Sequence, residues 1–132
     1  MQDKIQLLQL FICREFRQEK QDCFTAGQVM SNLYVPKFPV YLRNLLIVTC
    51  WQKDRRFHKE VIEYATDYGT STRSPHMDVE PITNSVLFRW HKHPFPSDFP
   101  LKKPTVLKVR VILDAQLRFE SCLLVERTPS QR

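Results

Sequence analysis

Glycine is nearly absent from this chain of 132 residues, which holds only Gly27 and Gly69. A backbone that must wrap closely around phosphate groups needs several glycines, so a phosphate-binding loop and a dinucleotide-binding fingerprint are excluded. No apolar run approaches the ~20 residues that a membrane-spanning helix requires. The four cysteines form no Cys-X-X-Cys pair, and reduced, mostly buried thiols are the simplest interpretation of them.

The sequence also lacks a catalytic signature. Ser85 or Ser121 can be combined with His91 and Asp98 into a serine triad, but neither serine lies in a nucleophile elbow. None of the cysteines has a histidine beside it in the sequence that would activate the thiol. We therefore predict a protein that is not an enzyme and that uses no cofactor.

Charge of one sign is not concentrated anywhere. The formal net charge of +6 divides into +2 over residues 1–44, +1 over 45–75 and +3 over 76–132, with no basic run or tail. A solvated surface of mixed charge is the interpretation that this spread favours, although an acidic partner such as nucleic acid stays open. Residues 1–8 are too polar for a secretory signal. We predict a cytoplasmic protein that does not associate with a membrane.

The clearest pattern that is present lies near the end of the chain. Residues 106–113 and 117–125 alternate apolar and polar side chains on either side of Asp114-Ala115-Gln116, which is typical of a β-hairpin. A turn of this length predicts three cross-strand pairs: Leu113 with Leu117, Val111 with Phe119, and Arg110 with Glu120. The two apolar pairs are predicted to point into a core, and the charged pair is predicted to face solvent.

Further strands are predicted from the other apolar runs. Together with the hairpin they give about seven strands, the others at residues 5–16, 23–30, 45–51, 57–68 and 82–91. Residues 14–22 form a polar hairpin tip, and residues 31–40 form an extended edge segment or crossover because two prolines interrupt them. This spacing predicts one domain over residues 1–132, an antiparallel β-sandwich with an immunoglobulin-like layout.

Two of these strands need a choice between alternatives. Residues 57–68 fit helical spacing as well as strand alternation, and we assign a strand because the neighbouring segments are strands. In residues 82–91 we assign Val86, Phe88 and Trp90 to the buried face, which leaves Arg89 and His91 on the opposite face.

The order of these parts resembles an uncharacterised bacterial and phage family of small immunoglobulin-like β-sandwich proteins, known only as a domain of unknown function. The resemblance rests on the strand that ends at Cys13-Arg14, the charged tip, residues 24–32, and Leu33-Tyr34-Val35-Pro36-Lys37-Phe38-Pro39 placed before the apolar strand 45–51. It would cover most of the chain, and it implies a fold without implying any chemistry.

The candidate interaction residues lie around the predicted strand 82–91. A basic surface flanked by Trp51, Trp90 and Phe95 would suit a single-stranded nucleic acid, which needs cations for phosphate and rings for stacking; its members are Arg55, Arg56, Arg89, His91, Lys92 and His93. The alternative places both tryptophans in the core. His91 and His93 also have the spacing of two metal ligands, but the sequence offers no third ligand nearby, so no metal site is predicted.

The segment Phe95-Pro96-Ser97-Asp98-Phe99-Pro100 is the second candidate. Its prolines hold the backbone extended, and Phe95 and Phe99 would then anchor a partner. In the alternative, both rings plug one end of the sandwich. The function predicted from these observations is a non-catalytic interaction or accessory module that binds an unknown protein partner or associates with itself through a sheet edge. A basic domain that binds single-stranded nucleic acid is the first alternative, and a metal-dependent enzyme is a weaker one.

Overall fold

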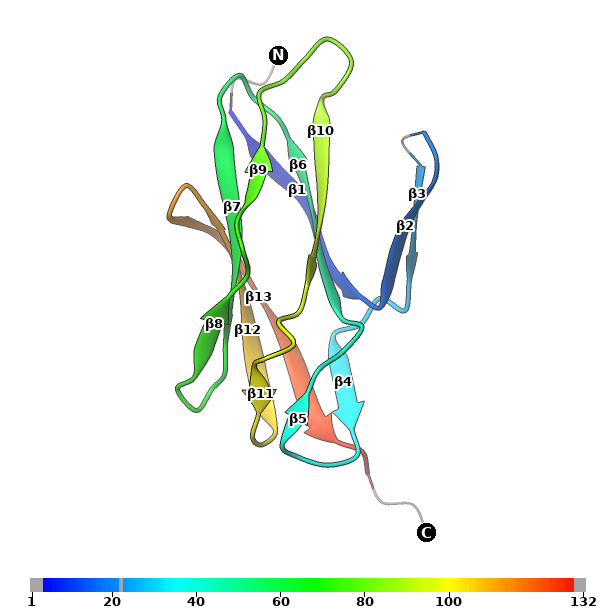
Figure 1. Cartoon of the computed structure of the whole chain (residues 1–132), viewed down its shortest axis with the longest axis vertical. Coiled ribbons are helices and arrows are strands. Elements are labelled where there is room, and N and C mark those ends of the chain that lie inside the picture. Colours follow the sequence, from blue (N-terminus) through cyan, green and yellow to red (C-terminus); the bar gives the residue numbers. More distant parts are fainter. Residues whose placement is uncertain (1–3, 22, 130–132) are drawn as a thin grey trace.

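The computed structural model describes residues 4–21 and 23–129, which form strands and connecting loops without a helix. The fold is therefore all-β, as the sequence predicts, and no helix capable of crossing a membrane occurs in the described part of the chain. One of the two larger sheets is antiparallel (Figure 1) and has the strand order β1 (Gln6–Cys13), β6 (Leu46–Gln52), β10 (Phe88–Pro94).

The second large sheet is mixed. Its strand order is β4 (Asn32–Val35), β13 (Gln116–Arg127), β12 (Thr105–Leu113), β7 (His58–Ala65), β8 (Ser71–Arg73), and β9 (Met77–Val79) also pairs with β7. The pair of β4 and β13 is parallel, so the prediction of a purely antiparallel fold is wrong at this edge. Residues 31–40, predicted as an extended edge segment or crossover, do contribute the edge strand β4. This strand ends at Val35 because the next residue, Pro36, cannot donate a ladder hydrogen bond.

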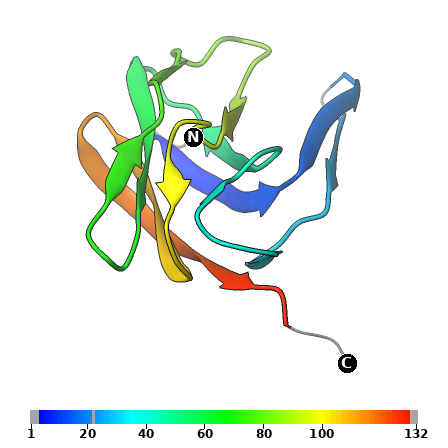
Figure 2. The ribbon, with the colours of Figure 1, turned by 60° about the horizontal axis from the view of Figure 1, so that its bottom comes forward.

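Two short strand pairs complete the described fold. The first apolar run breaks at Arg14 into β1 and β2 (Glu15–Lys20), and β2 pairs with β3 (Cys23–Gly27). This hairpin stands off to one side of the strands that surround the common interior (Figure 2). The prediction of a polar tip at residues 14–22 is wrong for the part that forms strand β2, and residue 22 of that tip lies outside the described residues. The other pair joins β5 (Val40–Tyr41) to β11 (Pro100–Leu101), and β11 lies in the proline-rich segment of residues 94–104.

The predicted hairpin of β12 and β13 is confirmed, with one change of register. Val111 faces Phe119 and Arg110 faces Glu120 as predicted, and Arg110 Nε donates to Glu120 Oε2 at 2.7 Å. The turn has only two residues, Asp114 and Ala115, both with positive φ, as in a type I′ turn. Leu113 therefore pairs with Gln116 instead of Leu117, and a bulge restores the register farther along.

The inward orientation predicted for Leu117 and Phe119 is wrong, since the two side chains are 58% and 48% exposed. They lie next to the turn, where β13 forms the edge of its sheet. β4 covers that edge only from Leu124 onward. Elsewhere the prediction of alternate burial holds, because Leu107, Val109 and Val111 are fully buried.

The main core lies between the two sheets. β6 contributes Ile47 and Trp51, and β7, confirmed as a strand, contributes Ile62 and Tyr64. Residues 58, 60, 62 and 64 of β7 are all buried, so the inward face of this strand includes a histidine and a glutamate as well as apolar residues.

The orientation predicted for β10 is inverted. Trp90 packs against Phe11, Phe16 and Phe24 on the outer face of the three-stranded sheet, beside the β2–β3 hairpin. His91 and His93 point into the main core instead. On the outer face Trp90 is half-buried, whereas Phe88 and Lys92 are exposed. Because both faces of β10 carry buried or half-buried side chains, alternation alone cannot tell which face is the inner one. The preceding residues 82–87, predicted as part of this strand, are loop.

A third buried histidine, His58, joins two loops at one end of the fold. His58 Nε2 donates to Asp54 Oδ1 at 2.8 Å, and His58 Nδ1 donates to Asp114 Oδ2 at 2.5 Å. Burial raises the pKa of both carboxyls, but hydrogen bonds outweigh it and the net pKa of each is lowered; Asp54 also accepts from the N–H of Arg56, and Asp114 from the N–H of Lys59.

This network predicts a loss of stability in acid. A carboxyl whose folded pKa lies below its unfolded value, about 3.9, contributes stability above that pH and loses it as the pH falls further. We expect the urea midpoint of the wild type to fall below about pH 4. The Asp54→Asn variant should show a shallower fall, whereas a variant of the exposed Asp98, Asp98→Asn, should follow the wild type. Identical pH profiles for the wild type and Asp54→Asn would contradict this role.

Candidate functional site

The proline-rich segment covers one end of the core. Phe95 is 6% and Phe99 is 9% exposed, and the Phe95 ring packs edge-on against Tyr64 with the ring centroids 4.7 Å apart. The N–H of Phe95 also donates to the carbonyl of Leu45 at 2.9 Å, which fixes the start of the segment. The prediction that these two rings are exposed and anchor a partner is therefore wrong. The alternative interpretation, in which both rings fill one end of the core, is the one that the structure shows.

The predicted basic surface is divided. Arg55 and Arg56 lie exposed in the loop between β6 and β7, and the half-buried Arg89 forms an ion pair with Glu80 at 3.4 Å. His91 and His93 are buried on the inner face of β10, so they cannot belong to an exposed surface together with these arginines. The reason is the inverted orientation of β10, which sends His91 and His93 inward.

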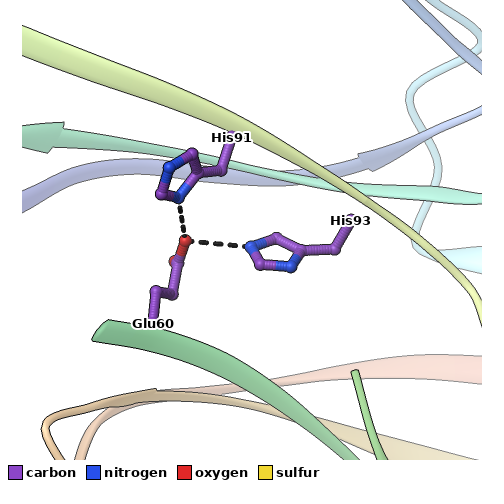
Figure 3. A group of neighbouring side chains, drawn as sticks. All are labelled: Glu60, His91 and His93. Carbon is purple, nitrogen blue, oxygen red and sulfur yellow. Dashed lines mark hydrogen bonds and ion pairs between the residues drawn. The ribbon is translucent and has the colours of Figure 1, made fainter. Parts of the chain in front are cut away.

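The two histidines instead meet a buried carboxylate. Glu60 Oε1 lies 2.5 Å from His91 Nδ1 and 2.9 Å from His93 Nε2 (Figure 3). The other carboxylate oxygen accepts a hydrogen bond from Trp51 Nε1 at 2.8 Å. Strands of both sheets build this cluster, because Glu60 comes from β7, the histidines from β10 and Trp51 from β6. We call Glu60, His91 and His93 the buried triad.

The protonation of the buried triad follows from its hydrogen bonds. Burial raises the pKa of the Glu60 carboxyl, but the hydrogen bonds from His91 and His93 outweigh it and lower the pKa to about 2. A carboxylate only accepts, so each ring nitrogen that faces it carries a hydrogen. His91 Nε2 lies 3.0 Å from the carbonyl oxygen of Asp78, a pure acceptor, and 3.3 Å from Arg89 Nε, a pure donor. These two contacts require opposite proton positions on Nε2, so they do not assign a proton to it.

Glu60 is the residue of this candidate site that sequence reasoning missed. It is 31 positions from His91, so no local motif contains both. The available signal was a charged residue on the buried parity of the strand 57–68, between positions that carry Ile62 and Tyr64. A charge at such a position is almost never buried without a partner, which makes it a marker of a polar site.

A second candidate site lies on the outer face of the three-stranded sheet. A groove of about 350 Å³ between β2–β3 and β10 has aromatic walls and a polar rim, and its lining residues are Phe16, Arg17, Gln18, Phe24, Phe88, Arg89, Trp90 and Lys92. We call it the Trp90 groove. The rings of Phe16 and Phe24 stack with centroids 5.0 Å apart, and the Trp90 ring lies 5.1 Å from that of Phe24.

An exposed apolar ridge continues the Trp90 groove. Val86, Leu87 and Phe88 are 43%, 47% and 47% exposed and line an adjoining hollow together with Phe24 and Trp90. The cations of the rim have partners of opposite sign or polarity. Arg17 pairs with Glu19 at 2.9 Å, and Arg89 pairs with Glu80 at 3.4 Å. Lys92 Nζ donates to the carbonyl of Phe16 at 3.4 Å.

Comparison with known proteins adds no relative. No protein-family model, no curated protein and no solved structure matches the chain.

Proposed function

We propose that this protein is a non-catalytic interaction module with an immunoglobulin-like sandwich fold. In the immunoglobulin layout, strands A, B and E share one sheet, and strands C′, C, F and G share the other. The orders β1-β6-β10 and β8-β7-β12-β13 support this proposal, because they correspond to A-B-E and C′-C-F-G in chain order. The β2–β3 hairpin is then an insertion after the first strand.

The binding surface that we propose is the Trp90 groove with its apolar ridge, and the partner is a second copy of this chain. The observation that carries the proposal is the run of three consecutive exposed apolar residues, Val86–Phe88, leading into β10. Among the described strands β10 pairs with β6 alone, so its other edge is open to a strand of another chain. A two-fold axis beside this edge would bring the same ridge together from both copies.

Charge favours a second copy over nucleic acid. The rim of the Trp90 groove contains both signs, since Arg17 and Arg89 lie beside Glu19 and Glu80. A surface of this kind meets opposite charges when it faces itself, whereas a chain of phosphates would be repelled by the two glutamates. The remainder of a chain with a net charge of +6 would repel its copy, which makes the balanced groove the favoured place of contact.

Sedimentation equilibrium tests the proposal. We expect the wild type to be a dimer at micromolar concentrations and the Phe88→Glu variant to be a monomer with an unchanged circular dichroism spectrum. The matched control is Phe57→Glu, since Phe57 is 50% exposed in the loop between β6 and β7 and does not line the groove. It should remain a dimer. A wild type that is monomeric at all concentrations overturns the proposal.

The nucleic-acid alternative has its own readout. Fluorescence anisotropy with a labelled oligothymidylate at low salt should show no binding if the proposal is correct. Binding that disappears at high salt and that weakens in a Phe88→Ala variant would favour the alternative instead, because stacking and phosphate contacts have that signature.

A further inference from the structure

The buried triad has the composition of a transition-metal site. One carboxylate oxygen and two imidazole nitrogens, each offering one ligand atom, all lie within 4.8 Å of one another, and all three side chains are buried. We propose that Glu60, His91 and His93 bind one zinc-class divalent cation that joins β7 of one sheet to β10 of the other. This inference does not depend on the proposed dimer, because the buried triad lies on the opposite face of β10 from Trp90.

The ligand atoms need only small movements to accept the cation. Nitrogen and oxygen ligands lie about 2.0–2.2 Å from zinc, which places neighbouring ligands in a tetrahedron roughly 3.4 Å apart. Glu60 Oε1 is now 2.5 Å from His91 Nδ1 and 2.9 Å from His93 Nε2, so each contact opens by less than about 1 Å. The two rings already stand nearly perpendicular, at 88°, with both nitrogens directed at the same oxygen (Figure 3).

The surroundings of the buried triad orient two of its ligands as in metal sites. A histidine ligand commonly donates its second N–H to a carbonyl or carboxylate, which fixes the ring, and His91 Nε2 faces the Asp78 carbonyl in this way. Trp51 Nε1 occupies Glu60 Oε2, which leaves Oε1 for the cation. Of the neighbouring cations, Lys92 points to the other face of β10, and Arg89, whose Nε donates to His91 Nε2 at 3.3 Å, forms an ion pair with Glu80.

His93 presents Nε2 to the site, and its Nδ1, on the other side of the ring, has no hydrogen-bond partner among the described residues. The proposal therefore rests on the donor atoms that face one another, not on Nδ1. The set of two nitrogens and one oxygen suits zinc better than magnesium or calcium, which prefer oxygen ligands.

Burial decides the role of the cation. Three protein ligands leave one coordination position, but ligand atoms this deep in the core are out of reach of an external substrate. The cation is therefore structural, and it would hold the two sheets together in the folded state.

Zinc binding to the full chain, purified without a histidine tag and stripped with a chelator, tests this assignment. We expect calorimetry to give one zinc ion per chain, and a hundredfold excess over Kd to raise Tm by about 5–10 °C. Cobalt(II) should give a visible spectrum of tetrahedral coordination. His93→Gln should lose stoichiometric binding, and the matched control His76→Ala, which removes an exposed histidine, should keep it.

Two outcomes overturn the proposal. One is a wild type that binds no stoichiometric zinc and whose Tm changes with neither zinc nor chelator, a result that needs no variant and holds even if His93→Gln fails to fold. The other is a folded double variant, His91→Gln/His93→Gln, that still binds one zinc ion with the affinity of the wild type.

Discussion

The Glu60→Ala variant is expected to lose about 3–5 kcal/mol of the free energy of unfolding, measured by urea denaturation in the presence of a chelator. Glu60 is fully buried and accepts hydrogen bonds from His91, His93 and Trp51. Its removal leaves three buried donors without their acceptor: His91 Nδ1, His93 Nε2 and Trp51 Nε1. Breaking a buried hydrogen-bond network in this way is among the most costly single changes in a protein.

The matched control for this variant is Glu63→Ala on the same strand. Glu63 faces outward and forms ion pairs with Arg73 and Arg110 at 3.0 Å each. Pairs near the surface contribute little, so we expect this variant to lose less than about 1 kcal/mol. Equal losses in the two variants would show that Glu60 is not the buried centre of a hydrogen-bond cluster.

The Phe95→Ala variant is expected to lose about 3–5 kcal/mol by the same measurement. The ring of Phe95 packs against Tyr64 and Phe99 at the end of the core, so its removal leaves a cavity between the two sheets. The control is Phe57→Ala, an exposed phenylalanine that should cost no more than about 0.5 kcal/mol. A loss below 1 kcal/mol for Phe95→Ala would mean that the proline-rich segment lies loosely over the core.

Two kinds of strand could be predicted from the sequence: strands with one apolar face and strands that are apolar on both faces. The β12–β13 hairpin alternates in sequence and closes through a local turn, and residues 45–51 carry apolar side chains on both faces, so burial specifies both. The parallel contact of β4 with β13 could not be predicted, because it joins segments about ninety residues apart and depends on which edge is left open.

Neither the orientation of β10 nor the buried triad could be predicted from the sequence, for related reasons. Phe88 and Trp90 are the more apolar side chains of that strand, and they were assigned to the core by their hydrophobicity. The fold contains a second hydrophobic cluster on the other face, which accepts Trp90 and leaves the inner face to His91 and His93. Those two residues are stable inside only because a strand distant in the sequence supplies Glu60.

The two tryptophans make the two hydrophobic clusters separately observable. Trp51 belongs to the main core and donates to a carboxylate, whereas Trp90 lies among phenylalanine rings on the outer face of the sheet. Replacing either one with phenylalanine leaves a single tryptophan, and when this residue is excited selectively over the tyrosines its emission maximum reports the polarity around that indole. Unfolding curves from the two single-tryptophan proteins would then reveal whether the β2–β3 hairpin detaches before the sheets separate, a question that a probe averaged over the whole chain cannot answer.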